Sequence, residues 1–419
     1  MQKWMGWILA ALMLLAGVAF ADEAVDITRY SRMKPNQNWG DLKRLRDGRI
    51  KTYWNGGKNA WIEFELPETR PCYGMYIRWA EEMMNFVVEK PGKDGEWEVC
   101  VPEPEHLFYN QYVPLEGLTR FRLRKTDPRE ENMAIGELQL LSEGDLPDFV
   151  QIWKPFEGKA DLLVLVAHPD DEVLWFGGMI PYYRGELGKK VLVVSVSRQP
   201  GSRKSELLDC LWTCGVREYP IVTGGEAFID RYSSYLKEVL EMWGEDNLLT
   251  FVARILREYQ PDVVATHDFN GEYGHAAHKA CAYAVEQCLE LASDAQFDPD
   301  SARKYGTWKP KKVYVHLYPE NQIIMDWRQP LEAFGGKTGF DMACLGFKRH
   351  KTQQSGKYAV QDKGRKDCRK FGLLYTSVGA DVQGNDLFEN IPGHSIKPAL
   401  EADAGEETMA SPEEADRKQ

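Results

Sequence analysis

Apolar and polar residues alternate in the first third of the chain. Short runs of period two occupy residues 60–66, 74–79, 86–89, 120–124 and 137–141, and turn-forming pairs such as Pro-Gly and Asp-Gly separate them. Such alternation is typical of strands that bury one face, and several of them in succession favour two packed sheets. The pattern predicts an antiparallel β-sandwich over residues 22–145.

The pattern changes after a proline-containing linker at residues 146–158. Continuous runs rich in Val and Leu are typical of strands buried on both faces, and they occur at residues 162–167, 191–196, 262–266 and 312–318. Amphipathic stretches predict helices at residues 203–214, 235–259 (with a break near Gly244) and 275–292. Alternating strands and helices predict a Rossmann-like α/β domain with a mostly parallel sheet over residues 159–395.

The ends of the chain have a different composition. A basic residue, an apolar run and an A-x-A site within residues 1–21 predict a signal peptide cleaved after Ala21. An uncleaved membrane anchor is the alternative, although the run is short for a span. No later stretch has the length and hydropathy of a membrane span, so the cleaved chain is expected to be secreted, at the cell surface or periplasmic. The acidic residues 396–419 predict a disordered tail.

Charge and cysteine content narrow the function classes. A formal net charge of -12 argues against nucleic acid as the main partner. Export would permit disulfides among the eight cysteines. Cys72 with Cys100, and Cys344 with Cys368, would each lie inside one domain, but the sequence leaves the connectivity open. The absence of a CxxC pair disfavours a zinc site built from cysteines.

Two polar clusters follow buried strands of the predicted parallel sheet. The sequence HPDDE at residues 168–172 follows one strand, and NGEYGHAAH at residues 270–278 follows another. Ligands of open parallel sheets bind at the carboxyl ends of strands, so the two clusters are expected to converge on one crevice. A catalytic zinc needs about three N or O ligands and one open position. His168, Asp171 and His278 supply that set.

The other polar side chains of these clusters predict acid–base chemistry. Asp170 lies beside the expected metal, where a carboxylate can act as general base. His275, if protonated, can stabilise an oxyanion or protonate a leaving amine. Either cluster alone would more often be structural, but their joint occurrence at strand ends favours the metal interpretation. The residues therefore predict metal-assisted hydrolysis of a carbonyl compound, with an amide favoured.

The hexad AHPDDE at residues 167–172, followed by Gly274-His275-x-x-His278, resembles the PIG-L/LmbE-like family of zinc-dependent N-acetylglucosamine deacetylases. The resemblance covers roughly residues 160–360. It implies Zn²⁺ as cofactor, the same three ligands, and the same roles for Asp170 and His275. It also implies that Tyr273 polarises the substrate carbonyl.

Two further residues and one departure belong to this resemblance. It implies that Arg203 contacts substrate, and that His350, in an HKTQ sequence similar to the family's H-x-S-Q element, lines the substrate site; a structural role for His350 is the alternative. Many members carry Asp or Asn where this chain has Ala277. That change puts the pH dependence of His275 in doubt, and the nearby His267 and Asp268 are candidates to replace the missing polar group.

The order of features in residues 45–138 resembles the discoidin-like (coagulation factor C-type) galactose-binding sandwich. The shared features are LRDG at 45–48, TYW at 52–54, WIEF at 61–64, RFRL at 120–123 and IGEL at 135–138. Such domains usually bind glycans or surfaces through loops at one end, and a spacer domain without a ligand is the alternative. Trp39 and Trp54 are candidates to stack on a sugar.

These observations together predict an exported zinc hydrolase that removes acetyl groups from N-acetylglucosamine-type amino sugars of extracellular glycans, with the sandwich holding the enzyme on a glycan. Asp230, in the loop before the second helical stretch, is expected to contact a sugar hydroxyl. One alternative is a glycan-binding surface protein with a vestigial catalytic domain. Another is a deacylase of a different N-acyl glycoconjugate.

Overall fold

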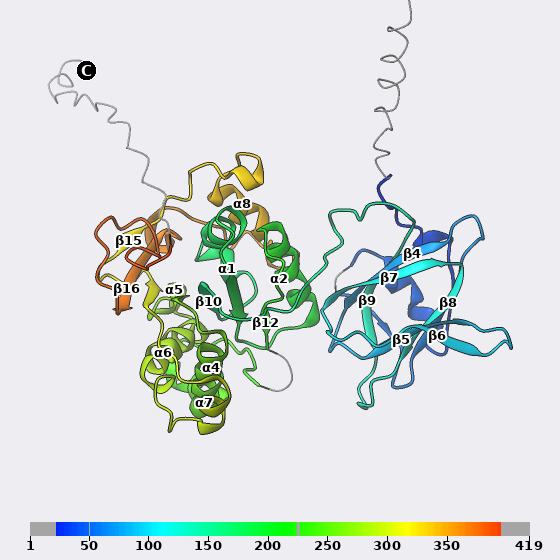
Figure 1. The fold of residues 1–419 in the computed structure, drawn as a ribbon, viewed down its shortest axis with the longest axis horizontal. Helices are drawn as coiled ribbons and strands as arrows, with labels where there is room; N and C mark the ends of the chain where they lie inside the picture. The colour runs from blue at the N-terminus through cyan, green and yellow to red at the C-terminus, as the bar shows by residue number, and fades with distance from the viewer. Residues whose placement is uncertain (1–21, 50, 224–226, 395–419) are drawn as a thin grey trace, which may run out of the picture.

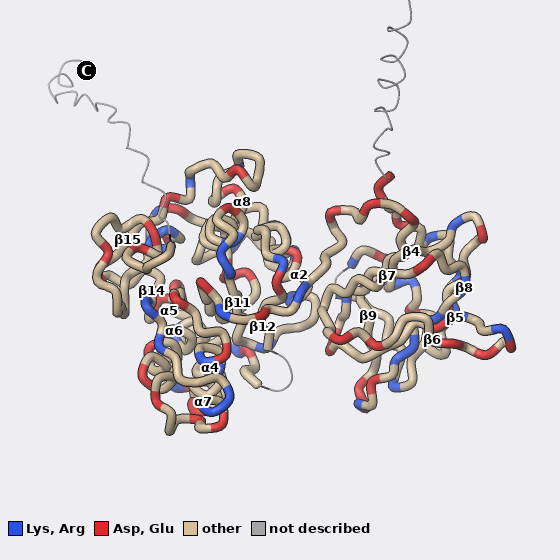
Figure 2. The backbone as a smooth tube through the Cα atoms, viewed as in Figure 1, with Lys and Arg blue, Asp and Glu red and all other residues tan. Residues whose placement is uncertain are grey.

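The computed structural model describes residues 22–49, 51–223 and 227–394, which form two domains side by side (Figure 1). The predicted signal peptide and acidic tail lie outside the described residues. Within the described ranges, no helix combines the length and the apolar character needed to span a bilayer. Acidic and basic residues are interspersed along both domains (Figure 2).

The N-terminal domain is the predicted antiparallel sandwich. Its sheets have the strand orders β1-β3-β8-β5-β6 and β2-β9-β4-β7, with antiparallel pairing throughout both. Apolar side chains such as Phe64, Ile77 and Phe121 are fully buried between the sheets. The strands are β1 (Arg32–Pro35), β2 (Trp54–Asn55), β3 (Trp61–Glu65), β4 (Cys72–Trp79), β5 (Phe86–Pro91), β6 (Trp97–Val101), β7 (Asn110–Leu118), β8 (Arg120–Lys125) and β9 (Ala134–Leu141).

The two tryptophans considered for sugar stacking lie in different environments. Trp54 is 0% exposed in the sandwich core, so the prediction that it stacks on a sugar is wrong. Trp39 is 55% exposed at the start of the 3₁₀ helix η2 (Trp39–Arg46), and its role stays a prediction.

The C-terminal domain has a seven-stranded sheet of order β12-β11-β10-β13-β14-β16-β15. The first five of these strands are parallel, and β16 pairs antiparallel with both of its neighbours, which confirms the predicted mostly parallel sheet. The four predicted buried strands correspond to β10, β11, β13 and β14. The strands are β10 (Leu162–Val166), β11 (Val191–Ser195), β12 (Ile221–Val222), β13 (Val263–Thr266), β14 (Lys312–His316), β15 (Ile323–Ile324) and β16 (Lys370–Thr376).

Helices cover this sheet where the amphipathic stretches predicted them. The stretch at residues 235–259 is two helices, α3 and α4, because Gly244 between them has a φ of 74°. The α-helices are α1 (Asp171–Leu174), α2 (Gly201–Thr213), α3 (Leu236–Trp243), α4 (Glu245–Tyr259), α5 (Gly271–Gly274), α6 (Ala276–Leu291), α7 (Pro299–Tyr305) and α8 (Gly339–Phe347). A π-helical segment, η3 (Pro181–Glu186), follows α1. Short 3₁₀ helices are η1 (Thr28–Tyr30), η4 (Glu332–Phe334), η5 (Lys351–Gln353) and η6 (Gly364–Lys366).

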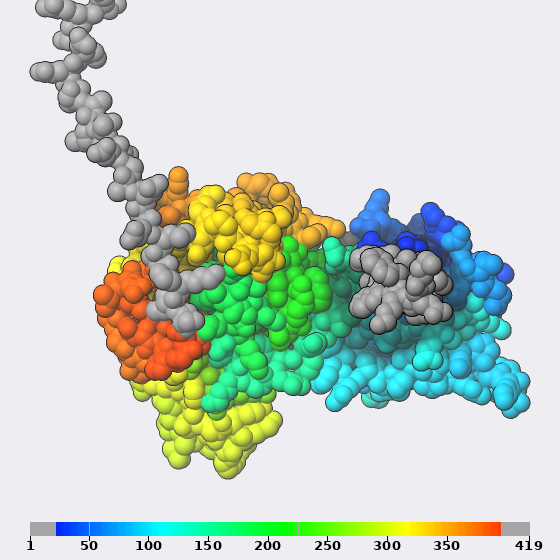
Figure 3. All heavy atoms as spheres, turned by 45° about the horizontal axis from the view of Figure 1, so that its top comes forward, coloured from blue at the N-terminus to red at the C-terminus, as the bar shows by residue number. Residues whose placement is uncertain are grey.

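Helix α2 packs against strand β4 of the sandwich, and the space-filling view shows the two domains in direct contact (Figure 3). Asp209 accepts two hydrogen bonds from the Arg78 guanidinium, at 2.9 and 3.0 Å. The Lys204 ammonium donates to the Tyr109 hydroxyl at 2.6 Å. Gly201 comes so close that a Cβ there would lie 2.1 Å from the carbonyl oxygen of Ala80. The two domains are therefore packed directly on each other.

All eight cysteines are free in the structure. Neither of the two pairings that the sequence left open is formed. Burial raises the pKa of Cys72 to about 12, and Cys210 and Cys214 are buried in and next to α2. These thiols are packed as small apolar side chains.

Candidate metal centre

The two predicted polar clusters meet at the carboxyl edge of the parallel sheet. Strands β10 and β13 are parallel neighbours, paired from Leu162 with Val263 to Leu165 with Thr266. The segments that follow them therefore leave the sheet at the same edge. After β10 the chain turns directly into α1, and after β13 a loop containing α5 leads into α6.

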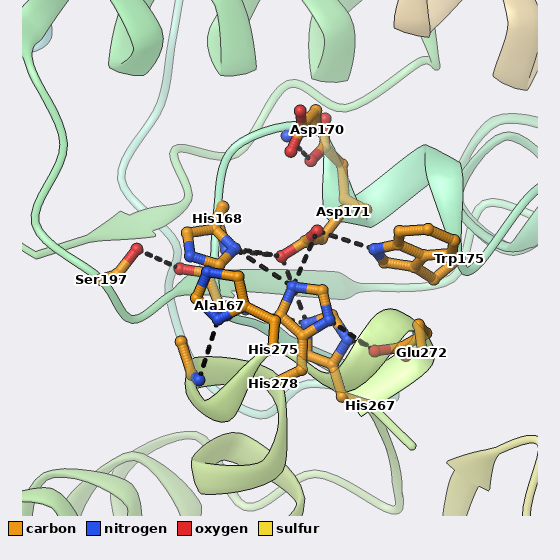
Figure 4. A network of polar contacts seen from close by, with 12 residues as sticks. Ala167, His168, Asp170, Asp171, Trp175, Ser197, His267, Glu272, His275 and His278 are labelled. Carbon is orange, nitrogen blue, oxygen red and sulfur yellow. Dashed lines mark hydrogen bonds and ion pairs between the residues drawn. The ribbon is translucent and has the colours of Figure 1, made fainter. Parts of the chain in front are cut away.

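His168, Asp171 and His278 point toward one another at this edge (Figure 4). Asp171 Oδ2 lies 3.1 Å from His168 Nδ1. His278 Nε2 lies 3.2 Å from His168 Nδ1 and 3.4 Å from Asp171 Oδ1. Ligand atoms around a tetrahedral zinc with bonds of about 2.0–2.1 Å are about 3.3 Å apart. Two imidazole nitrogens and a carboxylate at this spacing fit a zinc-sized ion, so the predicted ligands are brought together.

Carboxylates behind His278 and His168 determine which nitrogen of each ring carries the proton. His278 Nδ1 contacts the Glu272 carboxylate, and His168 Nε2 lies 3.2 Å from Asp230 Oδ1. Because an ionised carboxylate can only accept hydrogen bonds, each histidine donates its outer N–H to it. The opposite nitrogens, His278 Nε2 and His168 Nδ1, are then free to bind a metal ion.

Carboxylates surround the histidines of the cluster and favour a cation there. Although burial opposes ionisation, His278 and His168 hold the pKa of Asp171 well below its usual range. The facing carboxylates of Asp171 and Asp230 outweigh burial at His168 and raise the pKa of its ring to about 10. Trp175 Nε1 donates to Asp171 Oδ1 at 2.8 Å and fixes the carboxylate. The carboxylates that hold a proton on His168 also attract a metal cation, which would replace that proton.

Asp170 stands apart from the three ligands in Figure 4 and occupies an unusual backbone conformation. Its φ of 115° lies in the left-handed region, which costs on the order of 1–3 kcal/mol for a residue with a side chain. Its N–H donates to Glu172 Oε2 at 2.7 Å, and Arg203 Nη2 lies 3.1 Å from its carboxylate. Burial, opposed by Arg203, raises the pKa of Asp170 to about 7. A carboxyl group that titrates near neutrality has the pKa that a general base needs.

His275 caps the N-terminus of α6. Its Nδ1 accepts a hydrogen bond from the Ala277 N–H at 3.1 Å, so a neutral ring carries its proton on Nε2. Burial and the neighbouring histidines lower the pKa of His275 to about 4. The structure therefore favours a neutral ring over the protonated form considered from the sequence. A neutral ring can still donate one hydrogen bond from Nε2, and Ala277 orients it through its backbone.

Sequence reasoning missed Glu272, whose side chain is 0% exposed beneath the cluster. Its carboxylate contacts a ring nitrogen of His278, of His267 at 2.9 Å and of His316 at 3.1 Å. Its φ of 47° turns the side chain inward from a loop. The polar run NGEYGHAAH, which contains Glu272, was a signal in the sequence for this residue. The sequence around a loop carboxylate does not, however, show whether its side chain faces inward.

Tyr273 lies at the cluster, as predicted from the resemblance. Its ring centroid is 5.2 Å from that of His278 and 5.6 Å from that of His275. Arg203 also lies at the site, where its guanidinium contacts Asp170 and donates to Gln199 Oε1 at 3.3 Å. Both side chains therefore lie at the cluster, and their contact with a substrate stays a prediction.

Two predicted substrate-binding residues have other partners in the structure. Both carboxylate oxygens of Asp230 are engaged, one with His168 and the other with Gln199 Nε2 at 3.0 Å. His350 is 0% exposed, and its Nε2 lies 2.7 Å from Glu172 Oε1. Asp230 therefore contacts a candidate ligand histidine, and because its side chain is 26% exposed, its contact with a sugar stays a prediction. The ring of His350 lies behind the site and supports Glu172, so the structural alternative replaces its site-lining role.

Comparison with known proteins agrees with this geometry. Residues 163–289 match the PIG-L family model, described as GlcNAc-PI de-N-acetylase, so the C-terminal domain contains a PIG-L domain and the predicted resemblance is confirmed. The 1D-myo-inositol 2-acetamido-2-deoxy-alpha-D-glucopyranoside deacetylase 1 of Catenulispora acidiphila is 25% identical over 209 residues, which are 43% of this chain. The match spans 62% of that relative's length.

Solved structures resemble each domain separately. The N,N'-diacetylchitobiose deacetylase of Pyrococcus horikoshii is 16% identical and covers 48% of this chain and 74% of its own, with a TM-score of 0.33. The F5/8 type C domain of a Bacteroides fragilis protein is 16% identical and covers 29% of this chain and 97% of its own, with a TM-score of 0.25.

Proposed function

We propose that this protein is a metal-dependent hydrolase that removes the acetyl group from N-acetylglucosamine-type amino sugars. The observation that carries the proposal is the convergence of His168, Asp171 and His278 within the residues that match the PIG-L model. A carboxyl group with a pKa near neutrality lies beside them. Together these features provide a cation site and a proton acceptor, which hydrolysis of an amide requires.

We propose Zn²⁺ as the ion. Two imidazole nitrogens and one carboxylate oxygen form a donor set that zinc accepts in catalytic sites, where three protein ligands leave a position open. When bound, zinc supplies a Lewis acid that polarises the amide carbonyl and acidifies water. The carboxylates of Glu272 and Asp230 keep the ligand histidines in the required tautomers.

The remaining side chains of the site bind, orient and move protons. Asp170, with its pKa near 7, accepts a proton from the attacking water and can return one to the leaving amine. Arg203 holds the Asp170 carboxylate in place through its 3.1 Å contact. Tyr273 and the Nε2–H of His275 are donors beside the cluster and can stabilise the oxyanion of the carbonyl. The products are acetate and a free amino sugar.

We further propose that the enzyme acts outside the cytoplasm on glycans. The support is the sequence of residues 1–21, which has the three parts of a signal peptide. An exported deacetylase would act on extracellular N-acetylated polysaccharide, and the sandwich domain would hold the enzyme on that polysaccharide.

The test is acetate release by the full exported chain from N-acetylglucosamine and its β-1,4 oligomers. Release should stop after treatment with a chelator and return with added Zn²⁺. An Asp171→Asn variant serves as the control, because it keeps the side-chain volume but loses the charged ligand. No acetate from any N-acetylated sugar in the presence of Zn²⁺, or release unaffected by the chelator, would refute the proposal.

A further inference from the structure

A groove of about 270 Å³ opens between the two domains next to the metal centre. The loop after β4 contributes Glu81 and Glu82 from the sandwich, while the catalytic domain contributes Arg198, Lys204 and Asp230. Its volume is close to the lower end of ligand pockets, which suits one small ring rather than a large ligand. The groove is thus a composite of both domains.

Hydrogen bonds connect the groove directly to the catalytic side chains. Asp230, on the groove wall, contacts His168 Nε2 at 3.2 Å. Gln199, beside it on the same wall, donates to Asp230 at 3.0 Å and accepts from Arg203 at 3.3 Å. One side of this wall therefore faces the metal centre and its general base, and the other side faces the groove. Asp230 and Gln199 therefore connect the groove to His168 and Arg203.

The chemistry of the groove suits a polyhydroxylated ring. Carboxylates accept hydrogen bonds from hydroxyl groups, and Arg and Lys donate to them. Glu81 and Arg198 are exposed on opposite domains, so both can reach a ligand between them. Lys204 is nearly buried, donates to the Tyr109 hydroxyl at 2.6 Å and lies 3.6 Å from Glu82. These contacts fix the positions of the charged groups in the deeper part of the groove.

Close backbone packing fixes the width of the groove. At Gly201, on the groove lining, a Cβ would lie 2.1 Å from the Ala80 carbonyl oxygen, so a larger residue would push the domains apart. The bidentate contact of Arg78 with Asp209 holds the same interface. The sandwich is therefore held in a fixed position against the catalytic domain and forms part of the wall of the groove.

We propose that this groove is a second sugar subsite, in which the sandwich domain binds the sugar unit adjacent to the one deacetylated. The proposal rests on the proposed function and specifies its substrate class as an oligosaccharide of at least two units. Glu81 and Arg198 are the residues that recognise the second unit.

The test compares N,N'-diacetylchitobiose with N-acetylglucosamine as substrates of the full chain loaded with Zn²⁺. We expect the kcat/KM ratio to favour the disaccharide, and the Glu81→Ala/Arg198→Ala variant to lower that ratio about tenfold, as for loss of one hydrogen bond to a charged group. Glu116→Ala is the matched control, because Glu116 is exposed on β7 beside the start of β4, at the other end of the strand. A ratio equal in the double variant and the control would overturn the proposal.

A binding measurement separates this proposal from the proposed function. Calorimetric titration of the full chain with N,N'-diacetylchitobiose should show weaker binding to the double variant than to the Glu116→Ala control. This difference is expected even if no acetate is released, in which case only the proposed function fails. Equal affinities for the disaccharide in the two variants would exclude the groove as a subsite.

Discussion

Replacing Glu272 with glutamine should weaken metal binding while leaving the ligand set intact. The Glu272 carboxylate lies against ring nitrogens of three histidines, of which His278 is a proposed metal ligand. A carboxylate offers only acceptors, whereas an amide offers one acceptor oxygen and an NH₂ group that can only donate. In Glu272→Gln the histidine donors must compete for one oxygen, and at least one of them faces another donor in a buried site.

The size of the effect follows from what Glu272 does. It fixes the His278 tautomer that leaves Nε2 unprotonated, and it makes that nitrogen more basic. Loss of such a partner typically lowers metal affinity 10–100-fold, or about 1.4–2.8 kcal/mol. We expect a loss in this range, because none of the three ligand side chains is itself removed. At saturating Zn²⁺ much of the activity should return.

The assay is competition for Zn²⁺ between the purified chain and a chromogenic chelator, followed at constant pH. Glu286→Gln is the matched control, since Glu286 is exposed on α6 and changes the net charge by the same amount. Circular dichroism would verify that both variants are folded. A dissociation constant within about twofold of the control would refute the assignment of Glu272 as the residue that orients His278.

Three further predictions concern other parts of the molecule. Asp170→Asn should keep bound zinc by elemental analysis yet lose acetate release by a factor of about 10²–10⁴, and a normal rate would contradict its role as base. His278→Ala should lose the metal itself, so stoichiometric zinc in that variant would contradict the ligand assignment. Burial, with a smaller contribution from Asp47, raises the pKa of Glu137 from 4.5 to about 7, so the folded chain binds more protons than the unfolded chain between these values. The contribution of Glu137 to stability in urea should therefore be lost as the pH rises from 4.5 to 7, so Glu137→Gln should make the fall in stability over this range shallower; an identical slope in the variant would refute the cause.

The sequence was sufficient to predict those strands and helices whose apolar residues follow a clear pattern. Buried Val/Leu runs gave the positions of β10, β11, β13 and β14, and the polar residues that follow β10 and β13 do converge. Strand β7 was missed because Pro114 and Gly117 interrupt its alternation, although it pairs with β4 over much of its length. Pairing across the sheet compensates for weak local propensity, and a single sequence does not contain that information.

The convergence of the three predicted ligands could be predicted from the sequence, whereas the residues that support them could not. His168 and Asp171 are separated by three positions after a strand, so local geometry brings them together. The supporting contacts join residues far apart in the sequence: Asp230 contacts His168 across 62 positions, and His350 contacts Glu172 across 178. Such contacts depend on how the loops fold over the sheet edge, which a single sequence does not show.

Helix α2 belongs to the catalytic domain in sequence but packs against both domains. Its Arg203 contacts Asp170, the proposed general base, whereas Lys204, Ser205 and Asp209 bind the sandwich. Exchanging the sandwich for another module would leave these polar groups without partners and would release the helix that positions Arg203. The two domains are therefore expected to be inherited as a pair, and a catalytic fragment cut at the linker should be a poorer enzyme than the whole chain.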